Sequence, residues 1–384
     1  MIKKVFSAIL FCFYFVLSAY AQQNLAKTAW VDSVFSSLSL NEKIGQLFMV
    51  AAYSGGNEQH YQVIDQLVKK HHIGGLIFMQ GHPHSQASLT NRYQRHAEVP
   101  LLIAQDAEWG LGMRLDSTLS YPKQMTLGAI EEDSLIYQMG AEVARQLKLL
   151  GVHINLAPVA DINNNPQNPV IGDRSFGEDK KIVSQKAIAY MKGMQDNGII
   201  ACAKHFPGHG DTNKDSHVTL PVIKHKDSRL QQVELYPFKK LINAGVKSIM
   251  TAHLQVNAYD KKMPSSLSEK ITTQLLKEEM GFNGLVISDA LNMKAVADDH
   301  ENVELEALRA GNDILLFSQD VPGAVRSIKK ALRRKKISRS QFNSSVKQVL
   351  AAKFEAGLHN YVPANTDNVT LKLNRPEAEL LRQK

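Results

Sequence analysis

Residues 198–203 read GIIACA, a short apolar run that ends directly before two titratable residues, Lys204 and His205. A run of this length and composition is typical of a strand that is buried on both faces of a parallel sheet. Seven more runs of the same kind occur along the chain, at 44–51, 74–79, 100–105, 152–159, 246–252, 284–288 and 313–317. The sequence therefore predicts eight buried strands.

The segments between these runs have the periodicity of amphipathic helices. Met139 and Val143 recur at helical spacing within 138–150, and Val346 lies on the apolar face of 340–354. Strands that alternate with helices predict an α/β fold, here a closed (β/α)8 barrel that forms a single catalytic domain. An open, doubly wound sheet is the structural alternative, but no glycine-rich nucleotide turn follows the first run.

Polar residues stand at the carboxyl ends of five predicted strands. In a barrel these ends and the loops that follow them form the active site. The candidates are Asp106, Asp161, Lys204 with His205, His253 and Asp289. For Asp289 the alternative is a purely structural role as the N-cap of the next helix.

Residues 204–217 read KHFPGHGDTNKDSH, and we expect them to form a loop. Asp215 and His217 are two residues apart, so in an extended segment their side chains share one face. A carboxylate beside an imidazole raises its pKa and orients the ring, which suits a general acid/base. A hydrogen-bonded surface loop is the alternative. The histidines and aspartates fit none of the common metal-ligand spacings, so we expect no metal.

The first 21 residues have the pattern of a secretory signal peptide. Lys3 and Lys4 precede a continuous apolar run, and Ala19-Tyr20-Ala21 supplies the small residues of a cleavage site. We therefore expect cleavage near Ala21 and a periplasmic or secreted protein with no later membrane-spanning segment. Cys202 would then be the single cysteine, so no disulfide is expected.

The 384-residue chain has a formal net charge of +8, and its basic residues are dispersed except at 333–336. No aromatic residues are interleaved with that run, so we interpret it as a solvated helix end. We expect no nucleic-acid partner.

The chain resembles glycoside hydrolase family 3, and in particular its β-N-acetylhexosaminidase branch, from about residue 38 to 357. The most specific match is the KHFPGHGDTNKDSH segment. Further matches are NLAPVADIN at 155–163, GDRSFGED at 172–179, PSSLS at 264–268, SDALNMKAV at 288–296 and ALRAGNDILLF at 307–317.

This resemblance implies roles for seven residues. Asp289 would be the nucleophile that forms a covalent glycosyl-enzyme intermediate, and His217 would be the acid/base, held by Asp215. The residues that would bind the sugar hydroxyls are Asp106, Arg174, Lys204 and His205. The implied reaction releases terminal β-linked N-acetylglucosamine with retention of configuration and needs no cofactor.

The chain departs from the branch after its third predicted strand. The branch commonly reads Asp-Gln-Glu-Gly-Gly-Arg there, whereas residues 106–114 read DAEWGLGMR, so we expect Trp109 and Leu111 to change the rim of the site. The signal peptide favours peptidoglycan fragments or chitooligosaccharides as N-acetylglucosamine-containing partners. We expect the barrel to span 22–360, and 361–384 to be a tail that leads into a further domain of a longer protein.

Four other functions stay open on the sequence. A phosphorylase would use the same residues with phosphate as the acceptor, because a histidine acid/base does not repel an anion. Another family 3 β-glycosidase, a metal-dependent hydrolase and a non-catalytic glycan-binding barrel are the remaining alternatives.

Overall fold

The computed structural model describes residues 22–215, 219–298 and 300–384. The predicted signal peptide at 1–21 and the predicted acid/base His217 lie outside the described residues.

Eight parallel strands form the predicted barrel. Neighbouring strands follow the order β10-β1-β2-β3-β4-β5-β7-β9. A parallel bridge between Ile287 and Ile314 joins the two ends of this order and closes the ring. The strands are β1 (Phe48–Ala52), β2 (Gly75–Phe78), β3 (Leu102–Gln105), β4 (Ile154–Asn155), β5 (Ile200–Phe206), β7 (Ser248–Thr251), β9 (Leu285–Ser288) and β10 (Leu315–Leu316).

Each strand lies within or overlaps one of the eight apolar runs, so the predicted strands are confirmed. Nearly every strand residue is buried, because the barrel interior covers one face and the helices cover the other. One boundary was wrong. Lys204 and His205 lie inside β5 rather than after it, because parallel pairing with β7 continues as far as Phe206 and Thr251.

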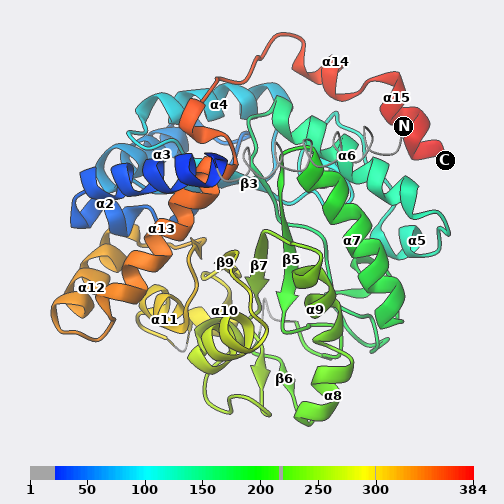
Figure 1. Ribbon diagram of the computed structural model, residues 1–384. Coiled ribbons are helices and arrows are strands. Elements are labelled where there is room, and N and C mark those ends of the chain that lie inside the picture. Colours follow the sequence, from blue (N-terminus) through cyan, green and yellow to red (C-terminus); the bar gives the residue numbers. More distant parts are fainter. Residues whose placement is uncertain (1–21, 216–218, 299) are drawn as a thin grey trace, which may run out of the picture.

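Helices surround the strands (Figure 1). The predicted helices at 138–150 and 340–354 are confirmed as α6 and α13. The helices are α2 (Leu40–Gly45), α3 (Glu58–His71), α4 (Pro83–His96), α5 (Gln124–Gly128), α6 (Asp133–Leu149), α7 (Lys180–Asp196), α8 (Asp227–Gln232), α9 (Tyr236–Asn243), α10 (Lys294–Ala297), α11 (Val303–Ala310), α12 (Val321–Arg333) and α13 (Arg339–Glu355). A π-type helix spans Lys270–Glu279, and short 3-10 turns span Leu111–Met113, Gly172–Arg174, Ser265–Leu267 and Leu358–Asn360. The basic run at 333–336 is exposed at the end of α12, as predicted.

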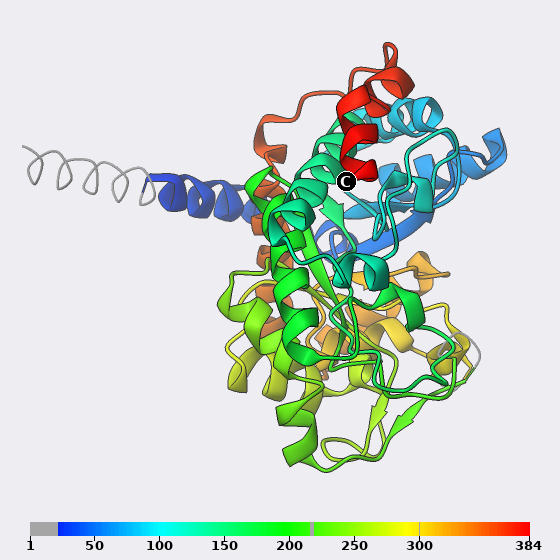
Figure 2. The ribbon, with the colours of Figure 1, turned by 90° about the vertical axis from the view of Figure 1, so that its right-hand side faces the viewer.

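Both ends of the described chain pack against the barrel. Residues 22–37 are helical (Figure 2), and the rings of Trp30 and Phe354 lie 6.0 Å apart. The tail forms α14 (Val369–Leu373) and α15 (Pro376–Gln383), which lie beside α6 on the outside of the barrel (Figure 1). Arg375 at the start of α15 lies 2.5 Å from the buried carboxylate of Glu142 on α6. Within the described ranges, every helix is too short or too polar to cross a membrane.

Candidate active site

The carboxyl ends of the strands surround a cavity of about 680 Å³. All eight strands contribute to it, either with their last residues or with residues that follow them. These are Tyr53, Met79, Asp106, Leu156, Lys204, His205, Met250, Asp289, Leu316 and Phe317. The cavity also contains Arg174, so five of the predicted site residues come together in one place.

Two carboxylates and three cations form a buried network on one side of the cavity. The Lys204 ammonium donates to Asp106 at 2.8 Å and lies 2.8 Å from Glu108. Arg114 donates to the second oxygen of Asp106. Arg174 binds Glu108 through two parallel hydrogen bonds, of 3.0 Å from Nε and 2.7 Å from Nη2. Paired bonds of this kind fix the plane of both side chains.

This network keeps both carboxylates ionised. Burial favours the neutral carboxylic acids, but the charges of Lys204 and Arg114 outweigh it and hold the pKa of Asp106 well below its usual value. Against the same burial, Lys204 and Arg174 lower the pKa of Glu108 to about 2. Ionised carboxylates only accept hydrogen bonds, so at neutral pH neither group can donate a proton.

Asp161 orients two histidines, His205 near the end of β5 and His209 in the segment that follows it. Its carboxylate accepts hydrogen bonds from the backbone N–H groups of His205 and His209, the latter at 2.6 Å. It also lies 2.7 Å from Nδ1 of His205, whose Nε2 is 3.4 Å from Nη2 of Arg174. Asp161 and Arg174 thus contact opposite ring nitrogens of His205 and fix the orientation of its ring. Burial lowers the pKa of His209 to about 4, which leaves that ring neutral.

Asp289 follows β9 and faces the cavity. Its backbone N–H donates to Thr251 at 2.9 Å, and its Oδ1 accepts from the N–H of Ala290 at 2.8 Å. Burial favours the acid form, but the nearby His253 and His205 outweigh it and lower the pKa of Asp289. The next helix, α10, begins at Lys294 with Met293 as its N-cap, so Asp289 is not a helix cap.

Glu108, Arg114 and His209 line the cavity but were not predicted as site residues. Glu108 stands two residues after Asp106 at the end of β3, so the strand-end rule could have identified it. Arg114 has no such signal, because its position depends on the course of the loop that follows β3.

The predicted loop begins only after β5 ends at Phe206, and it is described as far as residue 215. Asn168 holds the loop by donating to the carbonyls of His209 at 2.8 Å and Gly210 at 2.9 Å. A Cβ atom at Gly210 would lie 1.7 Å from the carbonyl oxygen of Ile162, so this close approach requires glycine.

Asp215 is partly exposed and does not line the cavity within the described part of the chain. Its carbonyl accepts from the N–H of Thr219 at 3.0 Å. Because His217 lies outside the described residues, the predicted pairing of Asp215 with His217 stays a prediction.

One of the two expected rim residues forms the rim. Trp109 lines the cavity, and Lys123 lies 5.3 Å from the centre of its ring. The prediction for Leu111 was wrong. It is fully buried at the start of a 3-10 turn, because the chain turns inward there to pack an apolar side chain.

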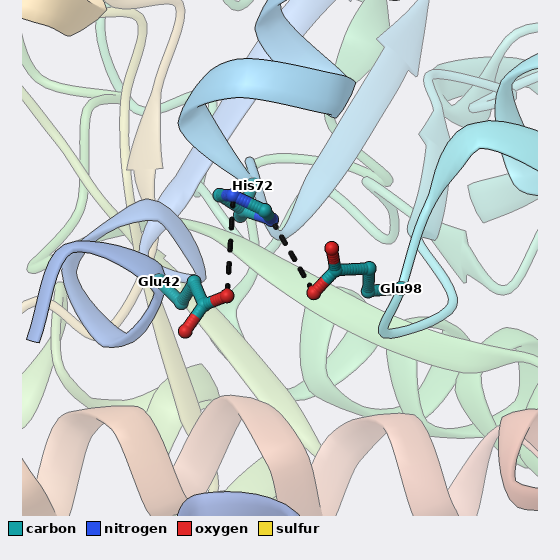
Figure 3. Close-up of side chains that lie close together, drawn as sticks. All are labelled: Glu42, His72 and Glu98. Carbon is teal, nitrogen blue, oxygen red and sulfur yellow. Dashed lines mark ion pairs between the residues drawn. The ribbon is translucent and has the colours of Figure 1, made fainter. Parts of the chain in front are cut away.

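Two clusters of histidine and carboxylate side chains bring potential metal-ligand atoms within 4.8 Å of one another among the described residues. In the first, shown in Figure 3, His72 lies between Glu42 at 4.0 Å and Glu98 at 3.8 Å. Glu42 is already engaged as the capping-box residue of α2, where it accepts from the N–H of Ser39 at 2.6 Å. This gives Glu42 a structural role.

The second cluster consists of Asp211, His225 and Glu234. Arg229 lies 3.0 Å from Glu234 and 3.8 Å from Asp211. The arginine thus already provides the positive charge that a metal ion would bring to these carboxylates.

Comparison with known proteins assigns the family. The family model described as the glycosyl hydrolase family 3 N-terminal domain matches residues 39–352. The chain belongs to glycosyl hydrolase family 3. The match confirms the family predicted from the sequence motifs, and the relatives below carry the name of the predicted branch.

The chain is 33% identical to beta-hexosaminidase A of Pseudoalteromonas piscicida, over 83% of this chain and 59% of that protein. It is 32% identical to beta-hexosaminidase LpqI of Mycobacterium tuberculosis, over 82% of this chain and 83% of that protein. The structure of a family 3 beta-N-acetylglucosaminidase from Paenibacillus sp. matches with a TM-score of 0.83 and 33% identity, over 90% of this chain and 68% of that one. The chain spans less than two thirds of the length of the first curated relatives.

Proposed function

We propose that this chain is an exported, retaining β-N-acetylglucosaminidase that releases terminal β-linked N-acetylglucosamine. The observation that carries the proposal is the cavity at the carboxyl ends of the strands, where Asp289 stands with a lowered pKa among fixed cationic and anionic partners. The names of the relatives at 32% and 33% identity support the same sugar specificity.

In the proposed first step, the Asp289 carboxylate attacks the anomeric carbon and forms a covalent glycosyl ester. The bond to the leaving oxygen breaks, and that oxygen takes a proton from the acid/base. In the second step the acid/base removes a proton from water, which attacks the same carbon and releases Asp289. Two successive displacements restore the original configuration.

The proposal assigns the acid/base role to His217, with Asp215 orienting it. Three carboxylates line the described part of the cavity, Asp106, Glu108 and Asp289, and the pKa of each is lowered. A general acid needs a proton to donate near neutral pH, and an imidazole meets that need more readily than these anions.

Asp106, Arg174, Lys204 and His205 would bind the sugar hydroxyls. An ammonium has three N–H donors, and Lys204 directs two of them at Asp106 and Glu108. The third is left for a hydroxyl, which can donate in turn to an ionised carboxylate. The rigid network would thus present donors and acceptors at fixed positions, which favours one sugar over another.

Export and substrate class rest on the sequence pattern at 1–21, which resembles a signal peptide. We propose peptidoglycan fragments or chitooligosaccharides as the substrates. The mass of the mature protein from its native host checks the export, because cleavage near Ala21 would remove the first 21 residues.

The function is tested by comparing hydrolysis of an aryl β-N-acetylglucosaminide with that of the aryl β-glucoside, in EDTA and with or without phosphate. Selective release from the N-acetyl sugar, unchanged by EDTA and phosphate, is expected. A sugar 1-phosphate product would instead establish a phosphorylase, and loss of activity in EDTA that zinc restores would establish a metal-dependent hydrolase. Binding of the sugar without turnover would contradict the enzyme proposal.

A further inference from the structure

His225 and Asp211 join the two ends of the segment that carries the proposed acid/base. Nε2 of His225 lies 2.5 Å from Oδ2 of Asp211. In sequence, the 211–225 segment contains both Asp215 and His217. The contact therefore closes a loop around the residues on which proton transfer would depend.

Asp211 is also linked to a buried anchor. Nη2 of Arg229 lies 3.8 Å from Asp211 and 3.0 Å from Glu234, whose side chain is only 3% exposed. Glu234 accepts a further hydrogen bond of 3.2 Å from Asn164, in the segment that follows β4. The chain at Gly208 passes close to Glu234, because a Cβ atom there would lie 3.0 Å from the Cβ of Glu234.

The two ends of the segment are otherwise held by different parts of the barrel. On the amino side, Asn168 donates to Gly210 at 2.9 Å and lies 3.2 Å from the hydroxyl of Thr212. On the carboxyl side, β6 (Val222–Ile223) pairs with β8 (Gln255–Val256), which follows β7. The side-chain contact between Asp211 and His225 thus links two limbs that different parts of the barrel hold, and Arg229 adds a longer contact of 3.8 Å to Asp211.

We propose that Asp211 and His225 are positioning residues for the acid/base step, and we call this pair the loop clasp. By fixing the separation of the two limbs, the clasp restricts the conformations of the segment between them, so that the acid/base is held where it can reach the leaving oxygen. This inference rests on the proposed function. A displacement of about 1 Å in a catalytic group can cost roughly 100-fold in rate.

A purely structural role predicts a different result. The side chains of His225 and Asp211 are 38% and 22% exposed, and ion pairs this accessible contribute little to stability. Losing the clasp should therefore leave the free energy of unfolding nearly unchanged. The loss of catalytic rate should instead depend on how much the leaving group of a substrate needs protonation.

The test uses the full chain with His225→Ala, Asp211→Ala and the double variant. Values of kcat/KM are measured on a 4-nitrophenyl β-N-acetylglucosaminide, whose leaving group needs little protonation, and on an unactivated disaccharide of N-acetylglucosamine. This ratio reports the first chemical step, so slow turnover of the glycosyl ester does not obscure it. We expect about a tenfold loss on the disaccharide and less than about a twofold loss on the aryl substrate.

Two controls separate the clasp from general damage. His225→Gln can place its amide nitrogen near the position of Nε2, so it should recover most of the lost rate. His96→Ala removes another histidine–aspartate contact, of 3.6 Å to Asp65 on the outer helices, where Asp65 also pairs with Arg92. It should change kcat/KM on neither substrate.

The double variant should be no slower than the slower single variant, because both substitutions remove the same contact. Equal losses on both substrates, or additive losses in the double variant, would overturn the clasp. If the wild-type chain hydrolysed neither substrate, the proposed function itself would fail, and that result is distinguishable from any effect of the variants.

Discussion

The ammonium of Lys204 lies 2.8 Å from a carboxylate oxygen of Glu108, a side chain with no exposed surface. Arg174 donates to both oxygens of the same carboxylate, and Asp106 shares the lysine. Removing one charge from such a network leaves its partner buried and uncompensated. The site and the stability of the barrel are therefore coupled through Lys204.

We expect Lys204→Met to destabilise the protein by about 3–5 kcal/mol, because Asp106 and Glu108 would lose the cation between them. Urea denaturation measures the change in the free energy of unfolding. Lys123→Met is the control, since its ion pair with Asp173 is half exposed and should contribute within about 1 kcal/mol. A Lys204→Met variant as stable as the wild type would contradict this account of the network.

Glu108 should make the protein sensitive to acid. Its pKa is about 2 in the folded protein against an ordinary value of 4.5, so the ionised form stabilises the fold above pH 4.5. That contribution falls as the pH drops from 4.5 towards 2. In Glu108→Gln this part of the pH dependence should disappear from unfolding curves recorded between pH 5 and 2. An unchanged slope would mean that Glu108 is not held ionised.

Lys353 should add a second rise of stability with pH, in an alkaline range. Its side chain is fully buried with Nζ 2.5 Å from the amide oxygen of Gln46, and burial lowers its pKa from 10.5 to about 7. The unfolded chain then binds more protons between pH 7 and 10.5, so stability should rise with pH by up to about 1.4 kcal/mol per unit. In Lys353→Met, thermal unfolding recorded across this pH range should show a smaller rise of stability with pH. If the rise is the same in the variant, other groups cause it.

Asp289→Ala should abolish turnover of activated and unactivated substrates alike, because the first displacement loses its nucleophile. With azide added, the activated aryl substrate should yield a glycosyl azide of inverted configuration, which NMR identifies. Residual activity with retained configuration would place the nucleophile on another residue. Folding is checked by comparing the thermal unfolding of the variant with that of the wild type.

His217→Gly should lower kcat/KM for the disaccharide by roughly 100-fold or more, and kcat/KM for the aryl substrate far less. The reason is that only the poor leaving group needs the proton. Turnover of the aryl substrate should then become limited by hydrolysis of the glycosyl ester, which a burst of nitrophenolate would reveal. Full activity on the disaccharide would remove His217 from the mechanism.

The strands and helices could be predicted because their signals are local. GIIACA and the seven similar runs become strands, and the spacing of Met139 and Val143 gives α6, since burial and periodicity depend on neighbouring residues. The strand-end rule located Asp106, Lys204 and Asp289 at one cavity for the same reason.

Other features depend on contacts between distant residues, and only the tertiary structure decided them. Arg114 and Leu111 lie three residues apart, yet one reaches Asp106 and the other packs into the core, because the turn between them sets their directions. The bidentate contact of Arg174 with Glu108 and the clasp between Asp211 and His225 join residues 66 and 14 positions apart. The sequence by itself determined which segments form the barrel and which polar residues stand at its carboxyl ends. The folded chain decided which charges meet there, because such pairing depends on distances in space that no local pattern contains.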